Sequence, residues 1–228
     1  MWPPFRSSSD TKLTMFVTDI CRSVTLKFHE ETHVKGVQAY SYLAEKTMLG
    51  NEEDDSSNNC FCLSDATTCL PSGGLNLSSC QFNAPAVVTY PHFLYADPAY
   101  AATVTGVKAV PEEHRMFIDI QPEMGIPMNV AARMQINIVF ERIEGISFFD
   151  NITSRIYFPI FWFSETAQLD ESMAKQLHLV THGLPMYTTI GCVILLVSGV
   201  ILMTIGFVIF LRHRKNKSNT KAYKQVQS

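Results

Sequence analysis

The feature that most constrains this chain is an uncharged, strongly apolar segment near its C-terminus. Residues 186–211 are 26 consecutive positions without a charge, rich in Ile, Leu, Val, Met and Phe. As a helix with a rise of about 1.5 Å per residue, the segment would be about 39 Å long. A bilayer core of about 30 Å needs about 20 apolar residues, and buried core helices rarely run this long without a charge. We therefore predict a tilted transmembrane helix over residues 186–211.

A strongly basic tail follows this apolar segment. Residues 212–228 contain six Lys and Arg residues and no acid. The positive-inside rule places such a tail in the cytosol, where its cations meet anionic lipid headgroups. Without those six cations, the net charge of −3 becomes −9 over residues 1–185. An acidic region on the far side of the membrane, above a basic tail, indicates a membrane protein and argues against nucleic acid as a partner.

Three segments therefore divide the chain. They are an extracellular or lumenal ectodomain over residues 1–185, the transmembrane helix over 186–211 and a cytosolic tail over 212–228. The first residues have neither the basic start nor the apolar run of a signal peptide, and they form no membrane helix. Because an ectodomain of this size needs a signal to cross the membrane, we expect the chain to be the C-terminal part of a longer protein.

Short stretches of alternating apolar and polar residues dominate the ectodomain. They are rich in Val, Ile, Phe, Tyr and Thr and are separated by Gly, Pro, Asn and Asp, a pattern typical of antiparallel β-structure. The expected strands cover residues 23–28, 36–43, 84–90, 114–120, 134–141 and 154–163. Pro159 lies inside the last stretch and predicts an edge strand or a β-bulge there. The predicted fold class is α+β, mainly antiparallel β, with one C-terminal transmembrane helix.

A helix is predicted just before the membrane segment. Apolar residues recur at helical spacing within residues 165–182, and Pro185 is expected to end that stretch. Residues 51–59 are polar and acidic and predict a solvated loop. The ectodomain therefore combines mostly strands with a few helices.

The sequence His-Glu-Glu-Thr-His over residues 29–33 matches the H-E-x-x-H signature of zinc metalloproteases. That chemistry needs both histidines on one face of a helix, with Glu30 as general base on a zinc-bound water. The preceding residues alternate like a strand and Gly36 follows like a turn, so the context argues against a zinc site. A membrane-anchored zinc hydrolase using His29, Glu30 and His33 is kept as an alternative hypothesis. We otherwise expect no catalytic residue, no metal and no cofactor.

The ectodomain contains five cysteines, an odd number for a disulfide framework. Four lie at positions 60, 62, 69 and 80, a spacing that departs from the paired Cys-x-x-Cys pattern of zinc sites. An extracellular or lumenal location favours disulfides instead. Cys60 and Cys62 are too close in sequence to pair readily, so each indicates a different partner. Bonding Cys62 to Cys69 would close a small loop, and bonding Cys21 to Cys80 would join two distant strands, leaving Cys60 alone.

Two further motifs concern modification and sorting. Asn76 and Asn151 each begin an Asn-x-Ser/Thr sequon in the ectodomain, beside turn-forming residues, and are predicted N-glycosylation sites. Asn216 also begins a sequon, but a cytosolic location should leave it unmodified. In the tail, Tyr223 and Val226 frame a tyrosine-x-x-apolar pattern that endocytic adaptors bind, although so short a pattern also arises by chance.

Small residues recur along one face of the predicted membrane helix, at intervals of seven or eight. They are Gly191, Ser198 with Gly199, and Gly206. Such residues let a second helix approach closely, although Gly is generally frequent in membrane helices. We hypothesise that this face contacts a second transmembrane helix.

Five longer blocks are more specific than these motifs. They are FVTDICRSV (16–24), CFCLSDATTCLPSGGLNLSSC (60–80), PHFLYADP (91–98), EEHRMFIDIQPEMGIPMNVAARMQINI (112–138) and YFPIFWFSE (157–165). Together they resemble the class B scavenger receptor family, which includes croquemort-like receptors, sensory neuron membrane proteins and a lysosomal integral membrane protein. The resemblance covers most of the chain, up to the end of the predicted membrane helix.

The resemblance implies a glycosylated ectodomain between two membrane helices. Its fold is an antiparallel β-barrel decorated with helices, a tunnel through it carries lipid toward the membrane, and a helical bundle at the apex captures ligands. This chain resembles only the C-terminal part of that ectodomain and the second membrane helix. We therefore expect a partial β-barrel with short helices. The chain itself would come from a truncated gene model, a splice form or a fragment.

The resemblance also implies particular residues. The three disulfides of the family, carried over by position, would join Cys21 to Cys80, Cys62 to Cys69, and Cys60 to a cysteine upstream of this chain. In alternating strands half of the side chains face the tunnel, but the sequence does not tell which half. The candidate tunnel residues are Ile118, Ile120, Ile136, Ile138 and Phe140.

The function that the resemblance implies is that of a non-enzymatic receptor at the plasma membrane, or alternatively in endosomes or lysosomes. Such a receptor binds and takes up lipids, lipoproteins, or apoptotic and microbial surfaces, and transfers lipid through its tunnel. Its membrane helix would contact the first membrane helix of the same protein or another copy. A fragment without ligand activity is the second alternative to this function, beside the zinc hydrolase.

Overall fold

The computed structural model describes residues 12–61 and 70–226. The chain divides into two compact units, Met1–Ala174 and Lys175–Ser228. The first unit contains all of the strands described, and the second is helical. The strands are β1 (Lys12–Val17), β2 (Arg22–Val34), β3 (Val37–Ala44), β4 (Gly74–Asn76), β5 (Ala86–Thr89), β6 (Phe117–Gln121), β7 (Ile126–Phe140) and β8 (Ile156–Gln168).

The helices of the first unit are short and lie between the strands. They are the 3₁₀ helices η1 (Thr18–Ile20), η2 (Lys46–Leu49), η3 (Ser56–Phe61), η4 (Pro91–Phe93) and η5 (Ser147–Phe149), with α1 (Pro98–Ala101) and α2 (Pro111–His114). Beyond the strands follow α3 (Glu171–His178), the π-helix η6 (Leu179–Gly183) and α4 (Leu184–Val226).

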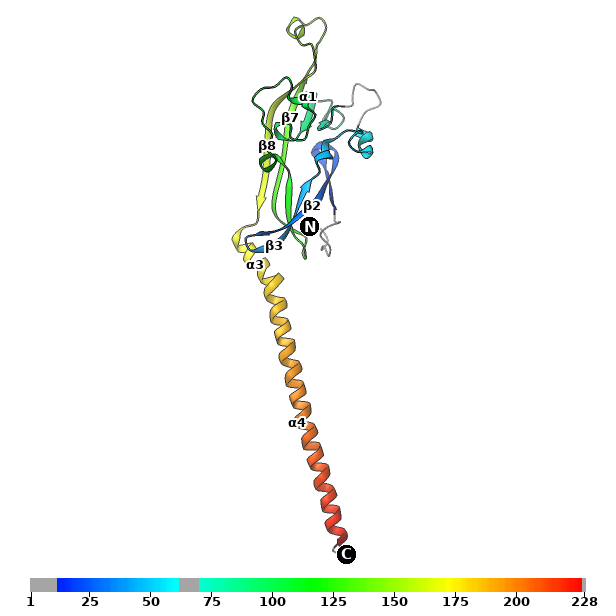
Figure 1. Ribbon diagram of the computed structural model, residues 1–228, viewed down its shortest axis with the longest axis vertical. Coiled ribbons are helices and arrows are strands. Elements are labelled where there is room, and N and C mark those ends of the chain that lie inside the picture. The colour runs from blue at the N-terminus through cyan, green and yellow to red at the C-terminus, as the bar shows by residue number, and fades with distance from the viewer. Residues whose placement is uncertain (1–11, 62–69, 227–228) are drawn as a thin grey trace. The chain divides into compact units, whose positions relative to one another are not determined.

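One antiparallel sheet of eight strands forms the first unit, with the order β1-β2-β3-β6-β7-β5-β4 and with β8 beside β7. The long strand β7 organises it. Along one edge β7 pairs first with β6 and then with β5, and along the other edge it pairs with β8 (Figure 1). Over the strands that the structure describes, β1 and β8 are not joined to each other, so the sheet does not close into a barrel. The predicted fold class, mainly antiparallel β with few helices, is confirmed.

The β2–β3 hairpin shows how local sequence sets the register of this sheet. Its turn consists of Lys35 and Gly36, both at positive φ (49° and 80°), and Val34 pairs with Val37. Two-residue hairpins prefer turns with positive φ at both central positions, because such turns follow the right-handed twist of the strands. The turn predicted at Gly36 is therefore present.

Alternation along the strands sends side chains to two apolar clusters on opposite faces. In β5, Val88 belongs to the larger cluster, which includes Leu13, Tyr42 and Ile118, whereas its neighbour Val87 packs with Phe93, Tyr100 and Tyr157. Each fully buried Val, Leu, Ile or Phe side chain stabilises the fold by about 1.5–3 kcal/mol before the cost of ordering it. The sheet is thus covered on both faces, by its own curl on one and by the segment after β5 on the other.

Pro159 lies at a β-bulge in an edge strand, as predicted. Strand β8 pairs only with β7 among the described strands, so it is an edge strand. The register of the pair shifts between Ile136 and Asn137, which face Phe161 and Pro159, so Ile160 is the extra residue of a bulge. Because proline cannot donate a ladder hydrogen bond, it is confined to such positions in sheets.

The helix predicted over residues 165–182 begins later than expected. Residues 165–168 belong to β8, where they pair with Asn129–Ala132 in β7, and cross-strand pairing overrides their helical spacing. Helix α3 begins at Glu171, after the Asp170 carboxylate accepts hydrogen bonds from the Met173 N–H (2.7 Å) and the Ser172 hydroxyl (3.0 Å). These bonds, the first of them most, lower the pKa of Asp170, as expected of a helix N-cap.

Other boundaries also differ from the sequence-based prediction. Pro185 does not end a helix; it lies in the first turn of α4, where a missing N–H is tolerated. The strand predicted over 114–120 begins only at Phe117, because Pro111 starts the short helix α2. Strand β2 continues through residues 29–34, beyond the predicted end at residue 28, with a register shift at His29.

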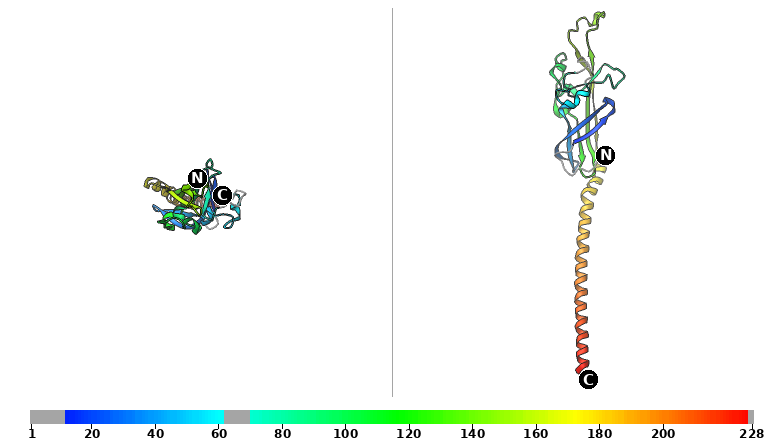
Figure 2. Two further views of the ribbon diagram at one scale, coloured as in Figure 1. Left: turned by 90° about the horizontal axis from the view of Figure 1, so that it is seen from above. Right: turned by 90° about the vertical axis from the view of Figure 1, so that its right-hand side faces the viewer.

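Helix α4 dominates the second unit. It runs without a break from Leu184 to Val226 (Figure 2) and includes the apolar residues 186–211. Among the described residues, one helix, over Glu171–Arg212, is long and apolar enough to cross a membrane. Its large apolar side chains are exposed, Leu195 and Leu196 by 71% and 70%, which is unlike a soluble core helix. These properties fit the predicted membrane span.

Candidate functional site

An apolar cavity of about 460 Å³ lies on the face of the sheet that carries the larger cluster. Only three of its lining residues are polar, namely Asp19, Gln81 and Glu165. The main apolar lining residues come from six strands and are Met15, Val17, Val24, Leu26, Val88, Ile118, Val130, Ala132, Met134, Ile136, Phe161 and Phe163. A cavity of this size and polarity suits a ligand with a substantial apolar part.

The predicted tunnel residues divide between this cavity and other places. Ile118 and Ile136 line it. Ile120 is fully buried in the same cluster without lining the cavity. Ile138 pairs with Ala86 and Phe158, and Phe140 contacts the rings of Phe149 and Phe158 at centroid distances of 6.5 and 6.2 Å. The structure therefore brings two of the five candidates together at the cavity.

Most cavity residues were not among the sequence-based candidates. Val130, Ala132 and Met134 precede Ile136 on the same face of β7, at two-residue intervals, so the alternation that flagged Ile136 could have identified them. Met15 and Val17 of β1 also lie two residues apart, but the stretch Lys12–Val17 was not predicted as a strand. Phe161 and Phe163 of β8 reach the cavity because β8 pairs with β7.

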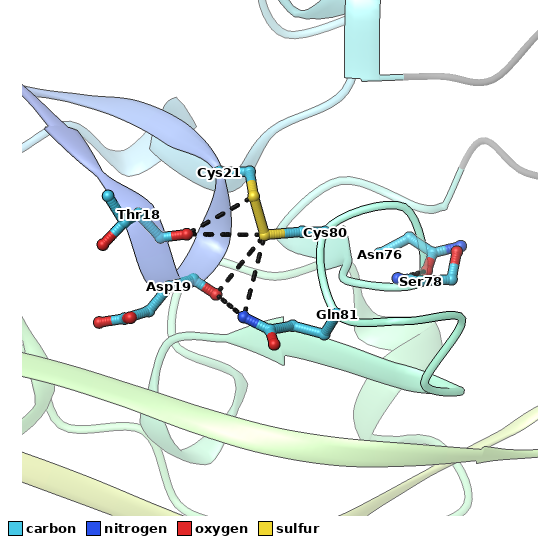
Figure 3. The surroundings of a disulfide bond; sticks show 7 residues. All are labelled: Thr18, Asp19, Cys21, Asn76, Ser78, Cys80 and Gln81. Carbon is cyan, nitrogen blue, oxygen red and sulfur yellow. Dashed lines mark hydrogen bonds between the residues drawn. A yellow bond between two sulfur atoms is a disulfide. The ribbon is translucent and has the colours of Figure 1, made fainter.

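A disulfide holds one end of the cavity together. Cys21, directly after η1, is bonded to Cys80, 59 residues further on (Figure 3), with their Cα atoms 5.8 Å apart. The Gln81 side-chain amide donates to the Asp19 carbonyl oxygen at 2.8 Å. Because Asp19 and Gln81 both line the cavity, this crosslink fixes two of its polar residues. The pairing is the one that the resemblance implies.

The other cysteines are only partly covered by the structure. Cys62 and Cys69 lie outside the described residues, and Cys60 is in η3 with a side chain that is not described either. Their predicted bonds therefore remain predictions. Among the described side chains, Cys192 in α4 is a free thiol, exposed on the apolar helix.

The two ectodomain sequons lie in different surroundings. Asn76 is the last residue of β4, and its side-chain oxygen accepts from the Ser78 N–H at 2.9 Å (Figure 3). It lines a second cavity of about 260 Å³, together with the ion pair of Arg155 and Glu141. Asn151 is exposed in the turn that follows η5. Glycosylation at both stays a prediction.

The H-E-x-x-H match does not form a zinc site. His29, Glu30 and His33 all lie in β2, where four residues span about 13 Å along the strand. A helix would bring such histidines within one turn of each other, and an extended strand separates them too far to bind one ion. Among the residues that the structure describes, no group of three His, Cys, Asp or Glu side chains could hold a metal ion. The zinc hydrolase hypothesis is therefore wrong in its structural premise.

The motifs of the second unit lie along α4. Gly191, Gly199 and Gly206 have open space where a Cβ atom would be, and the Ser198 hydroxyl donates to the Leu195 carbonyl oxygen at 2.9 Å. Tyr223 and Val226 fall in the last turns of the helix, where side chains are not described. Helix contacts and sorting therefore stay predictions.

Burial and neighbouring groups shape the ionisable residues of the first unit. Burial raises the pKa of Tyr90 and of Tyr100, with smaller contributions from Tyr95 and Tyr157 respectively. Both hydroxyls donate to backbone carbonyls, Tyr90 to Glu45 at 3.1 Å and Tyr100 to Pro71 at 2.8 Å. These phenols hold loops onto the sheet, and their neutrality at ordinary pH suits a structural role.

Known proteins resemble this chain over most of its length. It is 34% identical over 181 residues to sensory neuron membrane protein 2 of Anopheles gambiae, which covers 76% of this chain and 31% of that protein. It is 32% identical to scavenger receptor class B member 1 of Bos taurus, covering 86% of this chain and 39% of the receptor. Protein peste of Drosophila melanogaster is 31% identical, covering 88% and 35%.

These proportions set the scope of the resemblance. The chain spans about a third of the length of these relatives, so the activity of a whole relative does not transfer to it directly. The match to the family model is more extensive, because it covers residues 1–210, which include the sheet, the cavity and nearly all of the apolar segment. On this match and these identities, the chain belongs to the CD36 family.

Proposed function

We propose that this chain is a membrane-anchored, non-enzymatic receptor component that binds a lipid in the cavity of its sheet. The main observation that supports this proposal is the cavity of about 460 Å³ with its almost wholly apolar lining. An apolar ligand would gain about 25 cal/mol for each Å² of surface that it removes from water there. Membership of a family that includes scavenger receptors supports this function.

The proposal has a definite topology. Residues 1–185 form the extracellular or lumenal domain, residues 186–211 cross the membrane, and residues 212–228 form a cytosolic tail. The uncharged helix and the six cations after it support this order. The proposed location is the plasma membrane, or alternatively the endosomal or lysosomal membrane. Tyr223 and Val226 would form the sorting signal. The small residues of α4 would contact another membrane helix.

The wider function follows from the relatives. One relative is named as a scavenger receptor, scavenger receptor class B member 1. We propose that this chain contributes to the binding and uptake of lipids, lipoproteins, or apoptotic and microbial surfaces. Transfer of lipid through the cavity is part of the same proposal. Ile118 and Ile136 are the predicted tunnel residues that would contact the lipid.

Crosslinking with a photoactivatable fatty acid or sterol tests lipid binding by the full chain in detergent micelles. Ala132 lines the cavity and is half-buried, so Ala132→Trp fills space that the lipid would occupy. We expect labelling of β7 peptides to fall by about tenfold or more, since the loss of about 1.4 kcal/mol is tenfold in affinity. Ala102→Trp is the matched control, because Ala102 is exposed and does not line the cavity.

Folding of both variants is checked by thermal unfolding. Equal labelling of the wild type and of the folded Ala132→Trp variant would refute binding in this cavity. Labelling confined to α4 peptides would refute it too, because it would indicate that the probe dissolves in the detergent around the membrane helix.

A further inference from the structure

Two histidines from separate elements stack on each other outside the cavity. His92, in η4, and His114, the last residue of α2, have ring centroids 4.4 Å apart and planes 20° from parallel. Trp162 of β8 meets both rings edge-on, at 6.1 Å from His92 and 5.7 Å from His114. His114 is 4% exposed. The three rings form one aromatic cluster between the segment after β5 and the edge strand β8.

Hydrogen bonds join this pair to the backbone of a nearby loop. The Nδ1 atom of His92 accepts from the Lys108 N–H at 3.1 Å, and the Nδ1 atom of His114 accepts from the Val110 N–H at 2.9 Å. A nitrogen can accept such a bond only while it carries no proton. The two rings therefore fasten the backbone at residues 108 and 110.

Residues 92–95, which include the first histidine of the pair, have an unfavourable backbone conformation. His92, Phe93 and Tyr95 all have positive φ, at 56°, 58° and 62°, which costs a residue other than glycine about 1–3 kcal/mol. The His92 N–H donates to the buried Gln135 side chain at 2.9 Å. Strained segments persist only where surrounding contacts determine them, so weakening one contact favours release of the segment.

Burial and most neighbouring groups oppose protonation of His114. Burial lowers the pKa of His114 most, and His92 and Arg133 lower it further, while Glu113 acts in the opposite direction. Glu113 comes from α2 and Arg133 from β7, and β8 contributes the uncharged Trp162. Two imidazolium rings 4.4 Å apart would also repel each other.

We propose that His92 and His114 form an acid-sensitive latch, which fastens the loop over residues 104–110 at neutral pH and releases it at acidic pH. Uptake of a proton at Nδ1 of His114 removes the acceptor of the Val110 N–H and places positive charge against the His92 ring. Opening of the loop would expose the smaller apolar cluster, against which Val104 and Val107 pack. This latch acts outside the cavity and does not depend on lipid binding there.

The direction of the effect on stability follows from the lowered pKa. The unfolded chain takes up a proton on His114 below its ordinary pKa of about 6.5, whereas the folded chain does so only at lower pH. The stability contributed by neutral His114 is therefore complete above about pH 6.5 and is lost as the pH falls toward its folded-state pKa.

Fluorescence of Trp162 tests the latch directly. The chain has two tryptophans, Trp2 and Trp162, so Trp2→Phe leaves Trp162 as the sole reporter. A protonated imidazole quenches a neighbouring indole. In the full chain in detergent micelles, we expect Trp162 emission to fall reversibly as the pH decreases from about 7.5 to about 5. Constant emission over this range would refute the latch.

Asparagine variants separate titration from structure. Asn places its side-chain oxygen near the position of Nδ1, so His92→Asn with His114→Asn keeps the two acceptors and removes the titration. We expect the pH-dependent quenching and the faster hydrogen exchange of the 108–110 amides at acidic pH to disappear in this double variant. His33→Asn, at an exposed position in β2, is the control and should leave both responses unchanged.

Unchanged responses in the double variant would refute the assignment to this pair. The titration of the wild-type reporter needs no histidine substitution, so it decides the proposal even where the double variant does not fold. Loss of the response in His33→Asn would show that the response depends on a histidine outside the stacked pair, and it would refute the latch as well.

Discussion

The side-chain oxygen of Gln135, in the centre of β7, accepts the backbone N–H of His92 at 2.9 Å, 43 residues away in sequence. Gln135 is 2% exposed, and its amide nitrogen donates to Asn137 at 2.8 Å and to the Thr89 hydroxyl at 3.4 Å. Asn137 in turn donates to the Val87 carbonyl and to Thr89. A polar ladder thus links the sheet to the segment that covers it.

Replacing Gln135 with Leu should destabilise the fold by about 2–4 kcal/mol, because buried partners then lose their hydrogen bonds. Urea unfolding in micelles, followed by circular dichroism, measures this loss. Gln168→Leu, at an exposed position in β8, should cost less than about 0.5 kcal/mol. Equal effects of the two substitutions would contradict a special role for the ladder.

The Cys21–Cys80 disulfide should contribute about 3–4 kcal/mol, since it closes a loop of 59 residues in the unfolded chain. The double variant Cys21→Ser with Cys80→Ser should therefore unfold at lower urea concentration. Because the bond also fixes Asp19 and Gln81, crosslinking of the lipid probe should weaken in parallel. Cys192→Ser, in α4, serves as the control, and an equal effect there would exclude the disulfide as the cause.

Two glycines at positive φ, Gly73 and Gly106, allow the cost of a steric clash to be distinguished from the cost of backbone strain. A Cβ atom on Gly73 (φ 92°) would lie 2.3 Å from the Cα atom of Ala96, whereas one on Gly106 (φ 87°) would meet nothing within 4 Å. Gly106→Ala should cost about 1–2 kcal/mol through strain alone. Gly73→Ala should cost clearly more, because backbone atoms must move. Thermal unfolding midpoints compare the two, and a smaller loss for Gly73→Ala would contradict the close approach.

Alkaline pH should also destabilise the ectodomain. Burial raises the folded-state pKa of Tyr90 and Tyr100 above the unfolded value of about 10. A raised pKa means that the stabilisation is complete below about pH 10 and is lost as the pH rises toward the folded value. Tyr100→Phe should reduce the stability that is lost at alkaline pH, but it also removes the hydrogen bond to the Pro71 carbonyl oxygen. Urea midpoints against pH, with tyrosinate absorbance, measure both effects.

Glycosylation offers a test of topology. If residues 1–185 are extracellular or lumenal, Asn151→Gln and Asn76→Gln should each remove one glycan and increase electrophoretic mobility in cell-expressed protein. Asn216→Gln should change nothing, since a cytosolic tail is not glycosylated. Modification of Asn216 would invert the proposed orientation. Failure of Asn76 alone would indicate that its half-buried position in β4 restricts the transferase.

Much of the fold could be predicted from local sequence. The membrane helix follows from 26 uncharged residues, and most strands follow from alternation, because burial on one face of a strand leaves a period of two. The bulge at Pro159 follows from proline chemistry. Residues 165–168 were mispredicted because their helical spacing is a weaker constraint than pairing with β7.

The candidate site depended on information that lies between distant segments. Ile118 and Ile136 were identified by strand pattern, but Ile120 shares the pattern of Ile118 and does not line the cavity. Alternation therefore identified buried positions without telling which of them border the space. The stacking of His92 on His114 had no sequence signal at all, because it arises where two loops meet an edge strand.

By itself, the sequence determined that this protein has an apolar helix long enough to cross a membrane, a basic tail, an antiparallel β-region and the motifs of its family. Each of these depends on side chains that are near in sequence or on blocks that can be compared directly. Only the tertiary structure decided the face of the sheet that borders the cavity and the contact of His92 with His114. These depend on strand register and loop packing, in which residues far apart in the chain come within a few ångströms of each other.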